Sequence, residues 1–286
     1  MTSRNAQHAR GVLSILAGLS LWSLGVAIPA GAAAADPWPA SVRAAYEISF
    51  NGFSVGAFEF QSQAESESYK LVANARLSVL LGAFTWDGQT RSFGQLDSQA
   101  TKPASFAFDF KSNLRAGSTR LGFSDGTVTN IAHVPPTPPK PDAVPVREQH
   151  LKGVVDPLSA ILVLSRGPSA NPCDRRIPIF DGKERFDLVL SYKGDMRIAE
   201  QAPSGQPNIA HVCRIRYVPI AGHKLDNETR FMAANNDIEV ALRPIPSANV
   251  LVPYEINIPT MGGAATITSK RVEIVSPGKP QIALLY

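Results

Sequence analysis

Cysteines, histidines and recognisable catalytic motifs are scarce in this chain of 286 residues, which has two cysteines and five histidines. There is no C-x-x-C pair and no histidine-rich segment, so the sequence indicates neither a zinc site nor a dithiol redox centre. H-E-x-x-H, G-x-S-x-G and glycine-rich phosphate loops are also missing. We therefore predict no catalytic residue, no metal site and no cofactor.

A hydrolase stays open as an alternative, because serine, histidine and aspartate side chains can come together from distant positions. The histidines that follow residue 35 are His133, His150, His211 and His223. They are scattered along the chain, and we expect each to be an ordinary surface or hydrogen-bonded side chain.

An excess of one charge is also lacking, since 28 basic residues are interspersed with 24 acidic ones. No dense stripe of lysine and arginine is present, so we predict no nucleic-acid partner. Arg175, Arg176, Lys183 and Arg185 form one local basic group. Binding of anionic lipid headgroups or glycan phosphates is one interpretation of this group. The acidic residues among them favour a solvated hairpin of mixed charge.

Only the N-terminus carries a long apolar run. Arg4 and Arg10 precede the uncharged segment 11–28, and an alanine-rich stretch follows. This order predicts a secretory signal peptide over residues 1–35, cleaved near Ala35, with a membrane anchor as the alternative. No later run reaches the length of about 18 apolar residues that a helical span needs, so we expect no stable transmembrane span after cleavage.

Export into an oxidising compartment favours a disulfide between Cys173 and Cys213. Such a bridge closes a loop of about 40 residues and stabilises the fold by roughly 4 kcal/mol on the chain-entropy model. Two unpaired buried thiols are the alternative.

Most of residues 36–286 alternate between apolar and polar side chains, which predicts β-strands in one domain. Asn51 and Gly52 form a hairpin turn, and the apolar phase then slips, which predicts a β-bulge near Gly56. The alternation over residues 69–79 is long for a strand and suits a curved or twisted sheet.

One helix is predicted over residues 157–166. Asp156 is suited to cap its N-terminus, Pro157 to start it, and Gly167 to take the left-handed position after its end. The segment is apolar almost all round, so we expect it to be buried and to plug a concave sheet. The proline-rich segment 134–146 predicts a stiff connector, with recognition by a partner as the alternative.

An aromatic stripe is the candidate ligand-binding feature. Phe106, Phe108 and Phe110 alternate on one strand and so share one face. We consider two roles for them, the lining of a lipid cavity and ordinary core packing.

Several short segments together resemble domain-of-unknown-function family 3108. They are residues 52–57 (GFSVGA), 156–160 (DPLSA), 180–187 (FDGKERFD), 213–217 (CRIRY), 220–222 (IAG) and 252–259 (VPYEINIP). The resemblance implies an exported envelope protein of Gram-negative bacteria with a strongly curved antiparallel sheet. It supplies no catalytic residues.

The expected fold is mainly β, with a strongly curved antiparallel sheet, an open half-barrel or spiral, and one principal buried helix. We expect a periplasmic, non-enzymatic protein that holds a lipid or another amphipathic ligand, or an envelope protein, in the concavity of the sheet. The alternatives are a structural interaction module of the cell envelope and, more weakly, a hydrolase of envelope polymers.

Overall fold

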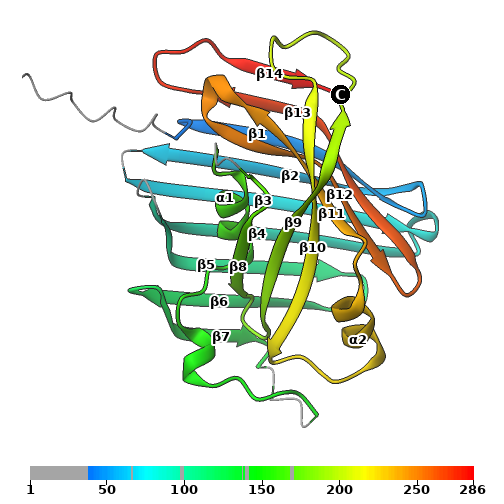
Figure 1. Ribbon diagram of the computed structural model, residues 1–286. Helices are drawn as coiled ribbons and strands as arrows, with labels where there is room; N and C mark the ends of the chain where they lie inside the picture. Colours follow the sequence, from blue (N-terminus) through cyan, green and yellow to red (C-terminus); the bar gives the residue numbers. More distant parts are fainter. Residues whose placement is uncertain (1–37, 66, 97–99, 137, 139–141, 168–170) are drawn as a thin grey trace, which may run out of the picture. The chain divides into compact units, whose positions relative to one another are not determined.

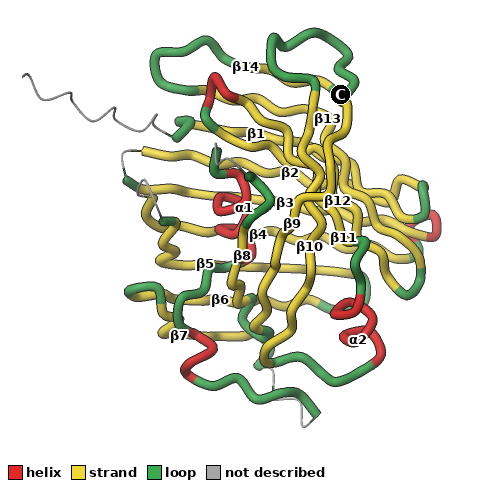
Figure 2. Tube along the Cα trace, viewed as in Figure 1, coloured by secondary structure: helices red, strands yellow, loops and turns green. Residues whose placement is uncertain are grey.

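A single antiparallel sheet of fourteen strands dominates the part of the chain that the structure, a computed structural model, describes (Figures 1 and 2). The described residues are 38–65, 67–96, 100–136, 138, 142–167 and 171–286. The predicted signal peptide lies outside them, as do residues 137 and 139–141 of the predicted connector. No helix within these ranges is long and apolar enough to cross a membrane.

The strands are β1 (Ser41–Phe50), β2 (Phe53–Glu65), β3 (Ser68–Val79), β4 (Phe84–Leu96), β5 (Thr101–Ser112), β6 (Ala116–Ser124), β7 (Thr127–Val134), β8 (Arg175–Phe180), β9 (Arg185–Arg197), β10 (Ile209–Ala221), β11 (Ile238–Ile245), β12 (Val250–Thr260), β13 (Gly263–Val275) and β14 (Ile282–Leu285). The helices are α1 (Pro157–Ser165) and α2 (Asn227–Ala234), and three 3₁₀ turns are η1 (Leu80–Gly82), η2 (Glu148–Leu151) and η3 (Pro246–Ala248).

The sheet is open, as predicted. Its order is β7-β6-β5-β4-β3-β2-β1-β13-β12-β11-β10-β9-β8, and β14 pairs with β13. Pairing of β1 with β13 joins two runs of consecutive hairpins, and the terminal strands β7 and β8 do not pair in the described residues. Figure 1 shows β8–β11 crossing over β3–β7, with α1 between them. One part of the continuous sheet therefore lies opposite another part, with α1 between the two.

A short crossing segment covers both terminal strands. Lys152 forms a bridge with Thr127 of β7, and Val155 forms a bridge with Ile179 of β8. Val155 also donates its N–H to the Pro178 carbonyl and accepts from the Phe180 N–H. These bonds occupy backbone groups that an exposed sheet edge would leave unpaired.

Two segments with turn-like sequences do not form the turns that their residues predict. Asp181-Gly182 between two strands is typical of a type I′ hairpin turn, but the structure has a loop over residues 181–184 in which Asp181 Oδ1 accepts the N–H groups of Lys183 and Glu184. The glycine and aspartate of the segment 193–195 (KGD) are typical of a turn, but strand β9 continues through this segment with a bulge at Lys193. In contrast, the bulge predicted near Gly56 is confirmed, because the β1–β2 register shifts there.

The described residues contain two helices, whereas the sequence predicted one. Helix α1 starts as predicted, with Asp156 accepting the N–H groups of Leu158 and Ser159. It is not buried along its whole length, because four of its nine residues are buried. Helix α2 has no buried residue, so its polar sequence carried no apolar period to reveal it.

The C-terminal end of α1 also differs from expectation. Gly167 does not take the left-handed conformation predicted for it. A Cβ atom at that position would lie 2.6 Å from the Asn249 carbonyl oxygen. Glycine therefore allows close backbone contact with β12, where Arg166 forms a bridge with Val250.

Candidate functional site

An apolar cavity of about 240 Å³ lies between α1 and the strands β1, β2, β12 and β13. Its lining is almost entirely hydrophobic. The lining residues are Trp38, Val42, Ala44, Tyr46, Phe58, Phe60, Ser62, Ile161, Leu162, Leu164, Ser165, Val250, Leu251, Val252, Pro253, Ile256, Ile267 and Val272.

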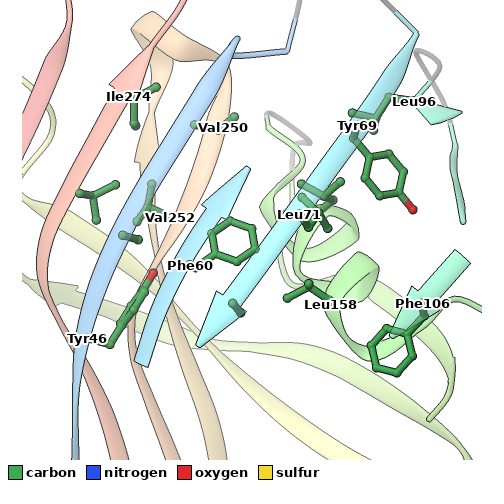
Figure 3. Close-up of a cluster of buried hydrophobic side chains, with 14 of the residues drawn as sticks. Tyr46, Phe60, Tyr69, Leu71, Leu96, Phe106, Leu158, Val250, Val252 and Ile274 are labelled. Carbon is green, nitrogen blue, oxygen red and sulfur yellow. The ribbon is translucent and has the colours of Figure 1, made fainter. Parts of the chain in front are cut away.

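The floor of the cavity follows from the alternation of β1 and β2. Val42 pairs with Ser62, Ala44 with Phe60, and Tyr46 with Phe58. Because successive side chains of a strand point to opposite faces, these cross-strand pairs project to the same side. Figure 3 shows Tyr46, Phe60, Val250 and Val252 gathered in this region. The small side chain of Ala44 opposite Phe60 leaves part of the volume open.

Helix α1 forms the other wall and is fixed at both ends. Leu158 and Leu162 pack in the core cluster shared with β1–β6, β12 and β13, whereas Ala160 packs with residues of β8–β12. At the C-terminus, the Arg175 guanidinium donates to the carbonyls of Val163, Leu164 and Arg166. These bonds satisfy carbonyls that the end of a helix leaves free.

Among the polar groups in the lining, three bear on what the cavity holds: those of Tyr46, Ser62 and Trp38. The Tyr46 hydroxyl donates to the Pro253 carbonyl at 3.1 Å, and burial raises the pKa of this hydroxyl well above its ordinary value. In contrast, Ser62 Oγ and Trp38 Nε1 are buried and have no hydrogen-bond partner within the described chain. Buried polar atoms without a partner are costly in a protein interior and need an explanation.

A buried polar cluster beneath α1 holds the helix against the sheet. Asp156 and Ser159 are fully buried. The Ser92 hydroxyl donates to Asp156 Oδ2 at 2.9 Å, and the Tyr69 and Ser159 hydroxyls are 2.7 Å apart. Each member has protein partners and none lines the cavity. The cluster therefore anchors α1.

The Asp156 carboxyl gives the cluster a pH dependence. Burial raises its pKa, although hydrogen bonds from Ser159, Ser92 and Leu158 oppose the shift. The folded chain therefore retains this proton to a higher pH than the unfolded chain. The protonated Asp156 carboxyl makes its full contribution to the free energy of unfolding below the pKa that this group has in the unfolded chain. That contribution is lost as the pH rises through the higher pKa of the folded chain.

Replacing Asp156 with asparagine is expected to remove this loss, because asparagine still caps a helix but does not ionise. Urea unfolding between about pH 4 and pH 7 should show a steeper decline for the parent protein than for Asp156→Asn. Asp226→Asn is the matched control. Asp226 caps exposed α2, and hydrogen bonding to Thr229 lowers its pKa. Parallel curves for Asp156→Asn and the parent would contradict the assignment.

The phenylalanine stripe and the cavity occupy different places. Phe106 is buried in the core, beside Leu158 in Figure 3. The Phe108 ring centroid lies 6.2 Å from that of Trp86 and 5.7 Å from that of Phe110. None of the three phenylalanines is among the residues that line the apolar cavity. Their predicted role in ligand binding stays a prediction.

The histidines do not assemble a hydrolytic set in the described residues. His211 Nδ1 lies 2.7 Å from Asp195 Oδ1, and His133 contacts Thr119 Oγ1 and the Gly182 carbonyl. His223 is buried, and no described serine is hydrogen-bonded to a histidine. Clusters of three or more histidine, cysteine or acidic side chains suited to a metal are likewise absent from the described ranges.

The local basic group is largely engaged in structural contacts. Arg175 caps α1, while Arg176 and Arg185 both form ion pairs with buried Asp187. This arrangement favours the structural interpretation over binding of anionic headgroups.

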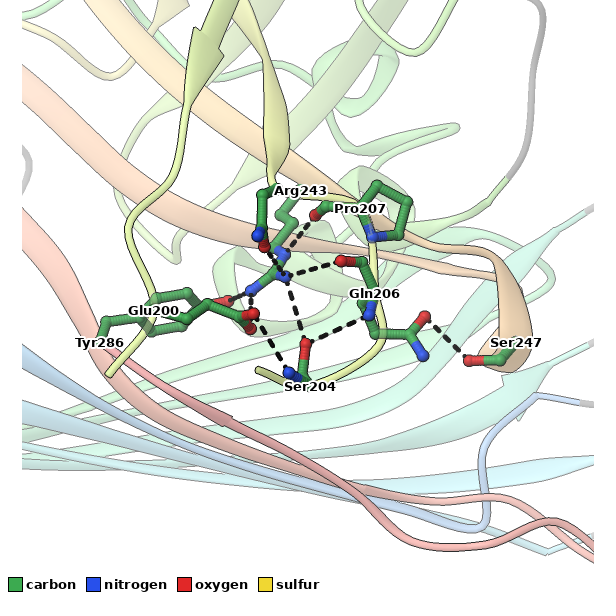
Figure 4. A network of polar contacts seen from close by, with 8 residues as sticks. Glu200, Ser204, Gln206, Pro207, Arg243, Ser247 and Tyr286 are labelled. Carbon is green, nitrogen blue, oxygen red and sulfur yellow. Dashed lines mark hydrogen bonds and ion pairs between the residues drawn. The ribbon is translucent and has the colours of Figure 1, made fainter. Parts of the chain in front are cut away.

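A second polar network surrounds Arg243, which is fully buried (Figure 4). Its guanidinium lies 2.7 Å from Glu200 Oε1 and donates to the Tyr286 hydroxyl, the Pro207 carbonyl and Asn208 Oδ1. The pKa of Glu200 is lowered, because hydrogen bonds from Arg243 and Ser204 outweigh its desolvation. The network is satisfied within the protein, so we assign it to stability.

The residues that make the cavity were not predicted from the sequence. The strand pattern identified the apolar side chains of β1 and β2, but it did not show that α1, β12 and β13 would enclose them. Ser62 carried a usable signal, because a serine interrupts the apolar phase set by Phe58 and Phe60. Trp38 lies before the first strand and gave no periodic signal.

The comparisons with known proteins name no activity. No curated protein matches the sequence. One solved structure that matches is the "Crystal Structure of Beta-barrel-like Protein of Domain of Unknown Function DUF1849 from Brucella abortus". It is 11% identical, covers 85% of this chain and 100% of that chain, and gives a TM-score of 0.49. The family described as "Protein of unknown function (DUF3108)" matches residues 45–270. The chain therefore belongs to the DUF3108 family, as its sequence motifs predicted.

Proposed function

We propose that this protein binds an amphipathic ligand with an alkyl chain in the cavity beneath α1, without catalysing a reaction on it. The observation that carries this proposal is the apolar cavity of about 240 Å³. For comparison, an apolar cavity of about 150 Å³ already accepts a benzene-sized molecule. Desolvation of the hydrophobic lining supplies the main favourable term for binding.

The unpartnered polar atoms orient the proposed ligand. Ser62 pairs with Val42 at the start of β1, and Trp38 precedes the same strand. An indole N–H only donates a hydrogen bond, whereas a serine hydroxyl both donates and accepts. The polar group of the ligand therefore accepts from Trp38 and Ser62, as a carboxylate, ester or amide oxygen does, while its alkyl chain extends toward Tyr46 and Ile267.

We further propose that the protein works in the periplasm. The predicted signal peptide supports this location, and the disulfide between Cys173 and Cys213 is compatible with it. A binding protein in that compartment meets amphipathic molecules of the cell envelope. Family membership itself assigns no ligand.

Filling the cavity should remove the ligand. Ala44 is buried, lines the cavity and lies opposite Phe60, so we expect Ala44→Phe to occupy the open volume. Native mass spectrometry of gently purified protein, with lipid analysis of its organic extract, should show a stoichiometric adduct in the parent. We expect the adduct to fall about tenfold or more in the variant, since excluding a chain of several methylenes costs well over 1.4 kcal/mol.

Ala45→Phe is the matched control, because it adds the same ring to the same strand on the opposite face of the sheet. Thermal unfolding must show that both variants fold, since overpacking costs about 1–3 kcal/mol. Retention of the adduct by folded Ala44→Phe would place the ligand elsewhere. A parent protein without any adduct, as a monomer or as a defined oligomer, would favour the interaction-module alternative.

A further inference from the structure

The most exposed apolar side chains gather on the hairpin turns at one end of the strands. Among the described large hydrophobic residues, the four most exposed are Leu81 at 109%, Leu80 at 80%, Leu114 at 79% and Phe53 at 76%. Met261, in the β12–β13 turn, is 63% exposed. Isolated surface hydrophobes are ordinary, but their concentration on successive turns is not.

Strand register places these turns along one edge, which we call the turn edge and define as residues 50–54, 79–85, 112–116 and 260–264. Asn51 donates its N–H to the Ala264 carbonyl, and Asn113 Nδ2 donates to the Ala83 carbonyl at 2.7 Å. The β1–β2, β3–β4 and β12–β13 turns lie together at the right of Figure 1. Adjacent hairpins are two strands apart, so the four turns extend over about 30 Å.

The β3–β4 turn has an unfavourable backbone for its residues. Leu80 and Leu81 have φ angles of 52° and 55°, in the left-handed region where leucine is uncommon. Asparagine or glycine adopts this conformation more easily. The packing of the protein does not explain the two leucines, because their side chains are exposed.

The two ends of these strands also differ in charge. The turn edge contains Arg115 and no acidic residue. At the opposite ends of the same strands, the turns contain Glu65, Glu67 and Asp125 and one described cation, Lys279, so acidic residues are in excess there. This asymmetry orients the apolar turns toward a negatively charged surface and the acidic turns away from it.

We propose that the turn edge docks on a lipid bilayer that contains anionic headgroups, with the apolar side chains inserted at the interface. Interfacial binding buries apolar side chains about 5–10 Å into the headgroup region and is strengthened by anionic lipid. Separate turns spread along an edge suit a soft, planar bilayer. A protein partner or a second copy of the chain would require a contiguous, closely packed patch.

Substitution of Leu80 and Leu81 tests the turn edge without disturbing the backbone of the β3–β4 turn. Leu80→Asn with Leu81→Gly replaces both by residues that favour the existing backbone, so folding should be preserved. Co-sedimentation should use vesicles of phosphatidylethanolamine with phosphatidylglycerol, and vesicles of phosphatidylcholine alone. We expect the parent to prefer the anionic vesicles, and the double variant to bind them about tenfold more weakly.

Phe93→Thr is the matched control, because Phe93 is also exposed but lies within β4, away from the turns. A fluorescent label at a single position reports only on its own surroundings. Its signal therefore does not depend on any binding of residues 11–28 to the vesicles. An environment-sensitive fluorophore on Leu81→Cys should shift to the blue on anionic vesicles and be quenched by brominated lipid, whereas one on Phe93→Cys should not.

A Leu81 label that stays in water on bound vesicles would overturn the proposal, as would equal vesicle binding by the parent and the double variant. Loss of self-association without loss of lipid binding would assign the edge to contacts between copies of the chain, which also overturns it. The test does not depend on the cavity, because Ala44→Phe should leave vesicle binding unchanged.

Discussion

Replacing Arg243 with methionine is expected to lower the free energy of unfolding by about 3–5 kcal/mol, the range for breaking one side of a buried ion pair. The Arg243 side chain is 0% exposed and that of Glu200 is 4% exposed. Methionine fills much of the same space but leaves the Glu200 carboxylate without its cation. The Pro207 carbonyl and Asn208 Oδ1 also lose a donor. Urea unfolding monitored by circular dichroism measures this loss.

Arg271→Met is the matched control for the buried pair. Arg271 is a strand arginine paired with Glu273, but its side chain is 62% exposed, so its loss should cost at most about 1 kcal/mol. Adding Glu200→Gln to Arg243→Met should recover part of the stability, because it removes the uncompensated charge. Equal effects of Arg243→Met and Arg271→Met would show that the network contributes little to stability.

Local sequence patterns predicted the helix start and the bulge, which depend on residues that are close together in the sequence. Asp156 and Pro157 predicted the start of α1, because helix capping depends on residues that are adjacent in sequence. The bulge beside Gly56 follows from a visible change of apolar phase. By the same reasoning, α2 was missed, because an exposed helix without an apolar stripe has no hydrophobic period.

Features that depend on distant contacts were less predictable. Val240 and Leu242 are two residues apart and so share one face of a strand. Strand alternation alone would therefore place the next residue, Arg243, on the other face, toward solvent. In the structure both faces of β11 are covered, and Arg243 is buried. The candidate site has the same origin, because its floor comes from β1 and β2, whereas α1, β12 and β13, which enclose it, are far from those strands in sequence. The phenylalanines were conspicuous in sequence, but the enclosure that makes a cavity is formed elsewhere.

Removal of the disulfide is the second change for which we expect a large effect. The two cysteines are visible in the sequence, but their contact joins distant parts of the chain. Cys173 and Cys213 are bonded, separated by 40 residues in sequence, and both fully buried. Cys173 lies just before the terminal strand β8, whereas Cys213 lies in β10, with β9 between the two strands. The bridge therefore fastens a strand that has one sheet neighbour to the interior of the sheet.

Replacing both cysteines with alanine should lower the free energy of unfolding by about 4 kcal/mol, since the unfolded chain regains the entropy of an open loop of this length. Urea unfolding measures the difference, and the parent unfolded with reductant present should approach the double variant. Intact mass after alkylation, with and without prior reduction, shows whether the bond has formed. An unchanged unfolding midpoint, with the bond intact in the parent, would mean that β8 is held by its contacts with β9 and Val155 alone. Because the predicted loss is comparable to much of the stability of an ordinary domain, the fold should be markedly less stable when the bond is reduced.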